Sequence, residues 1–262
     1  MSNNRPPLIV YLHGTPGSGG ELALVDGNNA LGPDICTPDR FGIDPQLDID
    51  TAFERLAEMI CKEGDTRPIH LIGFSLGAFA ALQVASRLGA RVVRLDLVSA
   101  AAPLELGHFL PDMAGRPVFE AARAGGWKFC ALVRLQAMFA RIMPGAMTSM
   151  LFASAAPADR ALLAAKGFRA RYRQILSASF TDGGVGYARE ISAYVRPWAG
   201  CLANISADTT LWHGSEDNWT PFTMAEALGA ALPADVRINR LAGLSHYSAL
   251  AAALSAIAEE SS

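Results

Sequence analysis

The stretch "HLIGFSLGAFAAL", residues 70–82, places Ser75 between Gly73 and Gly77, after an apolar run and before an Ala-rich one. The run before the serine predicts a buried strand, and the residues after it predict a helix. A serine in a G-x-S-x-G sequence at a strand-to-helix turn is typical of a nucleophile whose hydroxyl is exposed at the edge of a sheet. Because three Gly and Ser positions match easily by chance, the interpretation depends on what the rest of the chain supplies.

Short apolar runs alternate with stretches of helical spacing along most of the chain. The runs that predict strands are 8–14, 34–42 (a weaker one), 67–75, 92–100, 209–214 and 236–243. The stretches that predict helices are 49–64, 76–89, 129–143, 159–180 and 248–260. This alternation predicts an α/β fold with a mostly parallel sheet flanked by helices.

Between residues 103 and 200 the strand signals stop and only helical patterns remain. A helical block between two strand regions of one sheet predicts an inserted cap, or lid, on a core domain formed by residues 1–102 and 201–262. The cap holds 12 Lys and Arg against 6 Asp and Glu, whereas the rest of the chain holds 10 against 19. This excess of positive charge has two open interpretations. It could attract an anionic substrate, or it could belong to solvated helix faces, and the second interpretation is preferred.

The composition of the 262 residues excludes several classes of protein. Apolar residues make up 51% of the chain, which argues against disorder, and the net charge of −3 gives no reason to expect a nucleic-acid partner. The first residues lack the pattern of a secretory leader, and no apolar stretch reaches the ~20 residues of a membrane span. The cysteines are widely spaced. We therefore expect reduced thiols, no metal site and a cytoplasmic protein that does not bind membranes.

Attack by a serine requires a base that takes its proton and N–H donors that hold the resulting oxyanion. Leu76, which follows the serine and opens the predicted helix, offers one backbone N–H. A second is expected from the Gly-rich turn "HGTPGSGG" (13–20), where Thr15 is the better candidate because Pro16 has no N–H. The turn matches neither common phosphate-binding pattern, so it does not predict a nucleotide site.

The chain contains five histidines that could act as the base. His13 and His213 each precede a glycine at a strand end and are interpreted as structural, and His70 falls inside a predicted strand. His108 lies near the start of the cap, where a place in the pocket and one on the surface are both open. His246, in "LAGLSHYSAL", follows the last strand in a loop before the final helix. This position combines a loop with the sheet edge that carries the serine, so His246 is the expected base.

An acid that orients the base is expected on the loop after the preceding strand. The sequence "LWHGSEDNWTP" (211–221) places Glu216 and Asp217 there. The turn-forming residues favour Asp217, with Glu216 as a solvated neighbour. Glu105, which follows an earlier strand, is the alternative acid, and Asp96 inside that strand is interpreted as a strand-flank or capping carboxylate.

Ser75, Asp217 and His246 occur in the order Ser…Asp…His, each just past a predicted strand. With the segments "HGTPGSG", "PDRFG", "GFSLGA", "HGSEDNWTP" and "GLSHYS", the chain resembles the bacterial, capped members of the α/β-hydrolase family over nearly all of its length outside the cap. The resemblance implies that these three residues are nucleophile, acid and base. It also implies that the backbone N–H groups of Thr15 and Leu76 form the oxyanion hole.

Two features depart from the family pattern. Seven residues precede the first predicted strand, so the pair of strands with which the family commonly begins is not expected, and the sheet should have about six strands. The turn "DRFGID" replaces the usual DRPGxGxS-like sequence, which leaves the shape of that loop open.

The resemblance implies a serine hydrolase, without cofactor or metal, that cleaves a small hydrophobic carboxylic ester through an acyl-enzyme. Hydrolysis of a thioester, a lactone or a carbon–carbon bond, and cofactor-free perhydrolysis, use the same kind of site and stay open. A non-catalytic ligand receptor on a hydrolase scaffold is disfavoured because no triad residue is missing. The expected partner is a small-molecule substrate, and the sequence does not indicate the oligomeric state.

Side chains beside the expected catalytic residues, and some in the cap, are candidates for the pocket walls. They are Phe74, His108, Met138, Phe139, Trp219 and Tyr247. The cap also contains Met143, Met147, Met150 and Phe152. For the cap residues, a flexible apolar lining and plain packing between cap and core are both open, and the second is preferred.

Overall fold

The computed structural model describes residues 5–25, 31–32, 35–233 and 235–260. Five parallel strands form one sheet in the order β1-β2-β3-β4-β5. Their bounds are β1 Leu8–Leu12, β2 Ile69–Phe74, β3 Val92–Val98, β4 Asp208–Gly214 and β5 Val236–Leu241. Because all five strands run the same way, the loops that follow them meet at one edge of the sheet.

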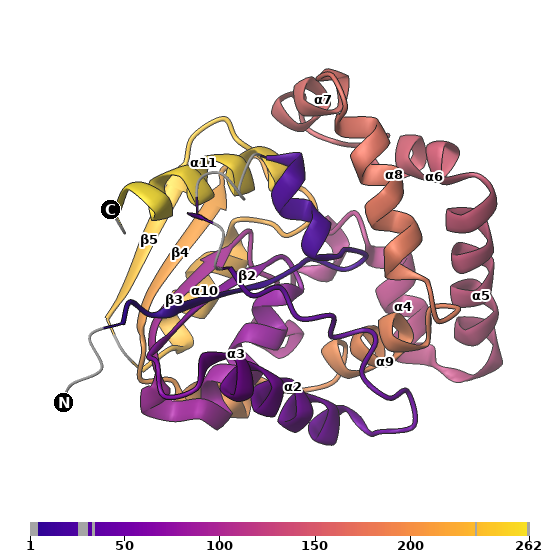
Figure 1. Cartoon of the computed structure of the whole chain (residues 1–262). Coiled ribbons are helices and arrows are strands. Elements are labelled where there is room, and N and C mark those ends of the chain that lie inside the picture. Colours follow the sequence, from indigo (N-terminus) through magenta and orange to yellow (C-terminus); the bar gives the residue numbers. More distant parts are fainter. Residues whose placement is uncertain (1–4, 26–30, 33–34, 234, 261–262) are drawn as a thin grey trace.

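Helices cover both faces of this sheet (Figure 1). α2 (Ile49–Gly64), α3 (Gly77–Leu88) and α10 (Thr223–Ala231) lie on one face, and α11 (His246–Glu260) lies on the other. Short 3₁₀ helices are η1 Gly19–Leu24, η2 Gly89–Arg91, η3 Leu104–Leu106, η4 Leu110–Asp112 and η5 Ala199–Asn204. Within the described residues, no helix has the length and hydropathy needed to cross a lipid bilayer.

Between β3 and β4, a stretch that the structure describes in full, the chain forms helices and no strand. These are α4 Arg116–Ala124, α5 Gly126–Ile142, α6 Pro144–Leu151, α7 Pro157–Ala164, α8 Phe168–Ser179 and α9 Val185–Tyr194. Figure 1 shows α4–α9, called the inserted helices below, gathered beyond one end of the sheet.

Three predicted elements differ from the structure. The described part of the chain has five strands rather than about six, because 34–42 contributes only an isolated bridge between Cys36 and Val10. Asp34 lies outside the described residues, and Pro38 has no N–H with which to extend the pairing. The expected helix 159–180 is divided into α7 and α8, since Gly167 between them has a left-handed φ of 86°. The last helix begins at His246 rather than after it.

A buried carboxylate joins the inserted helices to the core. Asp159 in α7 accepts hydrogen bonds from the backbone N–H groups of Tyr247 (3.1 Å) and Ser248 (2.8 Å) and from the Ser248 hydroxyl (2.8 Å). These residues lie in the first turn of α11, where N–H groups have no partner within the helix. A side chain of the inserted helices therefore caps the helix that begins at His246.

The turn from β2 into α3 packs tightly against the end of β1. A Cβ atom at Gly77 would overlap the carbonyl oxygens of Leu12 and His13, and one at Gly73 would lie 2.8 Å from the Ala81 methyl carbon. Backbone carbonyls cannot move aside as a flexible side chain can, so the position of Gly77 requires glycine. This contact brings the residues that follow β1 next to Ser75.

We expect Gly77→Ala to lower the free energy of unfolding by about 3 kcal/mol or more, because the added methyl group has no space. Gly200→Ala is the matched control, since a Cβ there meets nothing within 4 Å. Urea unfolding followed by circular dichroism measures both variants. Equal losses in the two would contradict the close approach of the backbones.

Candidate active site

Ser75 lies between β2 and α3 with a φ of 56°, a left-handed conformation that is unfavourable for residues other than glycine. Backbone hydrogen bonds hold it there. The Ser75 N–H donates to the carbonyl of Val98 (3.0 Å), and the Ala101 N–H donates to the carbonyl of Ser75 (3.1 Å). The end of β3 thus fixes a turn that presents the serine at the carboxyl edge of the sheet.

His246 and Asp217 form a buried pair in which Nδ1 of the imidazole lies 2.8 Å from Oδ2 of the carboxylate. Oδ1 of Asp217 accepts hydrogen bonds from the N–H groups of Trp219 (2.9 Å) and Thr220 (3.0 Å). Burial alone would raise the pKa of Asp217, but His246, His213 and the Thr220 N–H lower it to about 2. The carboxylate is therefore charged near neutral pH and favours a proton on Nδ1 of His246.

The His246 ring lies next to the turn that carries the serine. It packs against Phe74, the residue before Ser75, with ring centroids 4.7 Å apart, and it stacks on Trp219 at 5.2 Å. Among the described residues, no hydrogen bond joins the Ser75 hydroxyl to His246. The structure thus brings Asp217 and His246 into direct contact and places Ser75 beside them without such a bond.

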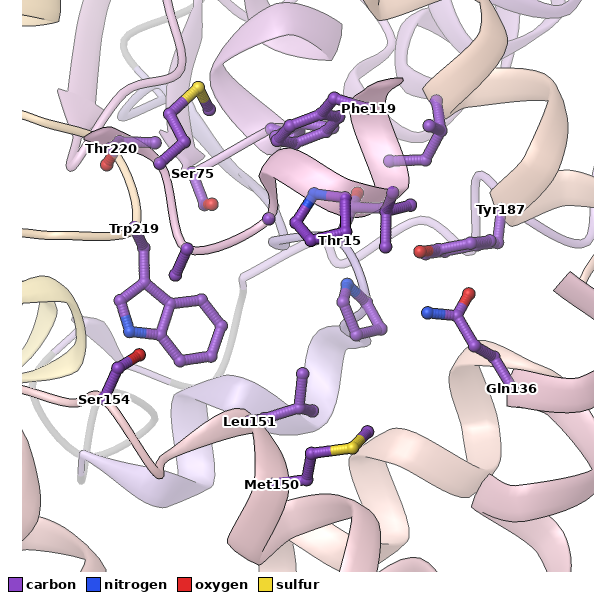
Figure 2. A pocket seen from close by; sticks show the side chains of 18 of the residues that line it. Thr15, Ser75, Phe119, Gln136, Met150, Leu151, Ser154, Tyr187, Trp219 and Thr220 are labelled. Atoms are coloured by element: carbon purple, nitrogen blue, oxygen red, sulfur yellow. The ribbon is translucent and has the colours of Figure 1, made fainter. Parts of the chain in front are cut away.

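A cavity of about 360 Å³ opens at Ser75 (Figure 2). Thr15 and Leu76 line it as well. Within the described part of the chain, the backbone N–H groups of Thr15 and Leu76 donate no hydrogen bond, so both can bind an atom in the cavity. The described lining residues include no Asp, Glu, Lys or Arg. The charged side chains of the inserted helices are therefore not among the described residues that line this cavity.

Three of the suggested wall residues lie close to His246, but only Trp219 lines the cavity. Phe74 is fully buried and packs against the rings of both His246 and Tyr247. Tyr247 is buried too, and its hydroxyl lies 3.3 Å from that of Tyr172. These two side chains support the imidazole instead of facing the cavity.

The three suggested wall residues from the inserted region lie elsewhere. His108 is exposed and borders a different surface depression, Met138 is 50% exposed on α5, and Phe139 packs partly buried against the core. Met138 and Phe139 lie in α5, which matches the predicted helix 129–143, but the spacing of residues does not fix which side of a helix faces the cavity. His108 lies in the short connection between η3 and η4. As cavity-lining residues, these three predictions are wrong.

The remaining walls come from the loop after β3, the inserted helices and the loop after β4. The apolar side chains include Met113, Pro117, Val118, Phe119, Met147, Met150, Leu151 and Ile191, and the polar ones include Gln136, Ser154, Tyr187 and Thr220. Of the cap methionines considered as an apolar lining, Met147 and Met150 line the cavity. Met143 does not, and it is 51% exposed. No local pattern singles out Gln136 or Tyr187, because they lie on separate helices, α5 and α9.

Three of the four other histidines lie in buried, structural positions. His13 Nδ1 contacts the Gly14 carbonyl oxygen at 2.8 Å, and His213 Nε2 contacts the Thr220 carbonyl oxygen at 2.7 Å. Burial lowers the pKa of both rings, so both are neutral near pH 7. His70 lies within β2 and pairs with Asp96 at 2.6 Å.

The other carboxylates considered in the sequence, Asp96, Glu105 and Glu216, do not contact His246. Asp96 is fully buried and also accepts from Arg94 (2.7 Å) and Trp212 (2.7 Å), so it belongs to a buried network rather than to a strand flank. Glu105 accepts hydrogen bonds from the backbone N–H groups at 198 and 199, and Glu216 is exposed.

Arg40 joins the loop of Thr15 to the inserted helices. Its Nε donates to Glu190 Oε2 in α9 at 2.6 Å, and its Nη2 donates to Glu190 Oε1 (2.9 Å), Thr15 Oγ1 (2.8 Å) and the Gly14 carbonyl (3.2 Å). The Thr15 hydroxyl donates to Glu190 Oε1 at 2.6 Å. Arg40 and Glu190 are each 3% exposed, so this ion pair is shielded from water. The pair thus holds the side chain of Thr15, a residue that lines the cavity.

Glu190→Gln is expected to lower the free energy of unfolding by about 3 kcal/mol, because it leaves the Arg40 guanidinium buried without a counter-ion. The double variant Arg40→Met with Glu190→Leu removes both charges and should recover most of that loss. Urea unfolding of Arg40→Met, Glu190→Leu and the double variant gives the coupling free energy. A double variant as unstable as the sum of the singles would show that the two charges do not act as a pair.

Glu21 in η1 is fully buried beside the same loop. Its Oε2 accepts hydrogen bonds from the Tyr11 hydroxyl (2.8 Å) and the Gly14 N–H (2.9 Å), and its Oε1 has no hydrogen-bond partner among the described residues. Burial raises the pKa of Glu21 to about 7, although Gly14, Tyr11 and Arg40 act in the opposite direction. No sequence pattern distinguishes Glu21, since an exposed acid in the first turn of a helix would give the same pattern.

The pKa of Glu21 is about 7 in the folded protein and 4.5 for a free glutamate. Its protonated form therefore contributes to stability in full below about pH 4.5, and this contribution is lost as the pH rises to about 7. Glu21→Gln does not titrate. Its free energy of unfolding relative to the wild type should therefore increase by about 2 kcal/mol between about pH 5 and about pH 8. Urea unfolding at the two pH values measures the difference. A difference independent of pH would contradict the raised pKa.

The model of the alpha/beta hydrolase family matches residues 9–260 of the chain. The match spans the sheet, the inserted helices and all the site residues described above. A search of curated proteins finds no match.

Solved structures with the same fold include enzymes of several kinds. A bromoperoxidase from Bacillus anthracis is 19% identical, with a TM-score of 0.66 and coverage of 98% of this chain and 90% of that one. A thermophilic esterase from Thermogutta terrifontis is 16% identical (TM-score 0.69; 98% and 89% covered), and an enol-lactonase from Burkholderia xenovorans is 15% identical (TM-score 0.67; 99% and 91% covered). At these identities the likeness shows the fold alone.

Proposed function

The chain belongs to the alpha/beta hydrolase family, and from this premise we propose that it is a serine hydrolase that cleaves a carboxylic ester, with the inserted helices as its cap. The observation that carries the proposal is the buried 2.8 Å contact between Asp217 and His246, next to a serine in a left-handed turn. A buried acid–imidazole pair beside a serine is the arrangement that activates a hydroxyl for acyl transfer.

His246 acts as the base in this mechanism. Because Asp217 occupies Nδ1, the nitrogen left to take the Ser75 proton is Nε2. Ser75 Oγ attacks the ester carbonyl carbon, and the alcohol leaves with the proton held by the imidazole. Water, activated by the same ring, then releases the acid and restores the serine. The hydrogen bond between Ser75 and His246 forms as substrate binds, as is common for catalytic pairs that are loose without substrate.

The negative charge that develops on the carbonyl oxygen needs donors already aimed into the cavity. The backbone N–H groups of Thr15 and Leu76 are without hydrogen bonds among the described residues and belong to residues that line the cavity with Ser75. We assign them as the oxyanion hole. Arg40 and Glu190 hold the Thr15 side chain and so help to fix one of the two donors.

The cavity walls support an uncharged, largely apolar ester as substrate. Apolar residues, among them methionine, leucine, proline, valine and phenylalanine, form most of the lining, and no charged residue is among the described ones. An apolar cavity with a few polar groups is the usual form of a small-molecule site. The excess of Lys and Arg in the cap is thus assigned to solvated helix faces.

Asp217→Asn is expected to lower kcat for p-nitrophenyl acetate by about 10⁴-fold, because an amide stabilises the wrong tautomer of His246 and cannot stabilise its cation. Glu216→Gln, an exposed neighbour, is the matched control and should retain the wild-type rate. Initial rates over a range of substrate concentrations separate kcat from KM. Similar losses in both variants would contradict the role of Asp217.

Two further measurements test the same proposal. A fluorophosphonate probe should label the wild type and leave Ser75→Ala unlabelled, and labelling of both would show that another residue reacts. The value of kcat/KM is then compared for an oxoester, a thioester and a lactone that share the same acyl group. Faster thioester or lactone hydrolysis would replace the ester assignment while keeping the same nucleophile.

A further inference from the structure

The outer side of α5 carries a row of large apolar side chains that face water. Trp127, Leu135, Met138 and Ile142, called the α5 stripe below, are each between 50% and 76% exposed. Their spacing along the helix places them on one side of it. Figure 1 shows α5 at the edge of the molecule that is farthest from the sheet.

The packing of the chain uses the other side of this helix. Phe129, Val133 and Ala140 of α5 are buried among the inserted helices. The α5 stripe therefore adds nothing to the core, although its members are as apolar as the buried residues. An exposed apolar patch of this kind on a protein surface commonly marks a site that binds a partner or a membrane.

The charged side chains beside the α5 stripe are all basic. Lys128, Arg134 and Arg141 lie exposed on α5, and residues 121–158 contain no Asp or Glu. On the helix, Lys128 lies along one edge of the stripe and the two arginines lie along the other. None of the three forms an ion pair with a described residue.

The neighbouring helices do not neutralise these cations. α4, α6, α8 and α9 pack against α5, and α6 and α8 contain no Asp or Glu. Glu120 of α4 is paired with Arg116, and Glu190 of α9 is buried with Arg40. An apolar row between unpaired cations is complementary to a partner that is both apolar and anionic.

A second copy of the chain fits this surface poorly. In a two-fold dimer the same patch faces itself, so the cations of one α5 would lie against those of the other. Like charges that are brought together in an interface weaken association. The charge distribution therefore disfavours self-association through the α5 stripe.

The exposed apolar side chains continue from α5 toward the cavity at Ser75. Met143, between α5 and α6, is 51% exposed, and Met150 in α6 is 58% exposed. Met150 also lines the cavity, as Figure 2 shows. The stripe itself lies on the outward side of one helix, a convex shape that a lipid surface can take up among its headgroups, whereas a folded partner needs a groove to bury it.

We propose that the α5 stripe docks on the surface of an anionic lipid bilayer, with its apolar side chains among the headgroups and Lys128, Arg134 and Arg141 on the lipid phosphates. Trp127 suits this position, because an indole ring has an apolar body and a polar N–H. The sequence predicts no membrane binding, and this proposal differs because the spacing of residues does not show which apolar side of a helix stays exposed. Docking does not depend on the chemistry at Ser75, so the inference stands apart from the proposed function.

Sedimentation of the full chain with lipid vesicles tests the proposal. Vesicles of phosphatidylcholine are compared with vesicles that also contain about 30% phosphatidylglycerol. The chain should bind the anionic vesicles at least about tenfold more tightly, and added salt should weaken this binding. Since the net charge of the whole chain is −3, such a preference requires a local basic surface. Equal binding to both vesicles, or binding to neither, would overturn the proposal.

Variants identify the apolar part of the surface. Trp127→Gln removes an exposed apolar side chain without changing the charge and should lower the affinity for anionic vesicles about tenfold. Met59→Gln, at a position of α2 that is 45% exposed, is the matched control and should bind as the wild type does. Equal affinities of the two variants would overturn the place of the docking surface.

A second pair of variants identifies the cations. Arg134→Gln with Arg141→Gln should bring the affinity for anionic vesicles close to that for neutral ones. Arg55→Gln with Lys62→Gln, both exposed on α2, is the matched control and should keep the preference. Circular dichroism checks that every variant is folded, which is expected because all the exchanged side chains are exposed. A preference that survives the loss of Arg134 and Arg141 would contradict their role.

The remaining outcomes separate other occupants of the surface and the proposed function. Light scattering without lipid measures the oligomeric state, and a dimer that Trp127→Gln dissociates would assign the stripe to a second copy and overturn the proposal. A monomer that binds no vesicle would leave the stripe to a protein partner and overturn it as well. Ser75→Ala should bind vesicles as the wild type does, so a failure of ester hydrolysis leaves this result intact.

Discussion

The backbone of the turn that holds Ser75 lies directly against the end of β1, and the geometry of the whole site depends on this contact. A side chain at Gly77 would overlap the carbonyl oxygen of Leu12. With glycine there, the chain that leaves β1 passes close to the start of α3, and Thr15 and Leu76 line one cavity. The two residues proposed as oxyanion donors thus follow two neighbouring parallel strands of the sheet.

The features that the sequence predicts correctly are either local or imposed by the topology of a parallel sheet. The strand and helix on either side of Ser75 have strong local patterns. Asp217 and His246 follow β4 and β5, which are neighbours, so their loops must meet at one edge. The candidate strand at 34–42 fails because its pattern is weak and contains a proline. The histidine chosen as base also proved to be the first residue of α11.

The features that could not be predicted depend on how the inserted helices are rotated and crossed. A helical pattern gives the element but not the packing angle of its neighbours. Glu190 meets Arg40 across 150 positions of sequence, and Gln136 meets Tyr187 from a different helix. The same limit explains why Met138 on α5 faces solvent. Nothing in the order of residues distinguishes a helix side that lines a cavity from one that packs or is solvated.

The carboxylate of Asp159 has a consequence for any exchange of the inserted helices between proteins of this family. It belongs to the inserted helices, yet it satisfies N–H groups at the start of the helix that carries His246. A chimaera that exchanges this segment for that of a relative would remove the cap of α11 as well as the cavity walls. Exchange of substrate preference between family members is therefore not modular here. A transplanted segment has to bring an acid to the same point in space, or the core helix must acquire a new N-terminal residue that replaces it.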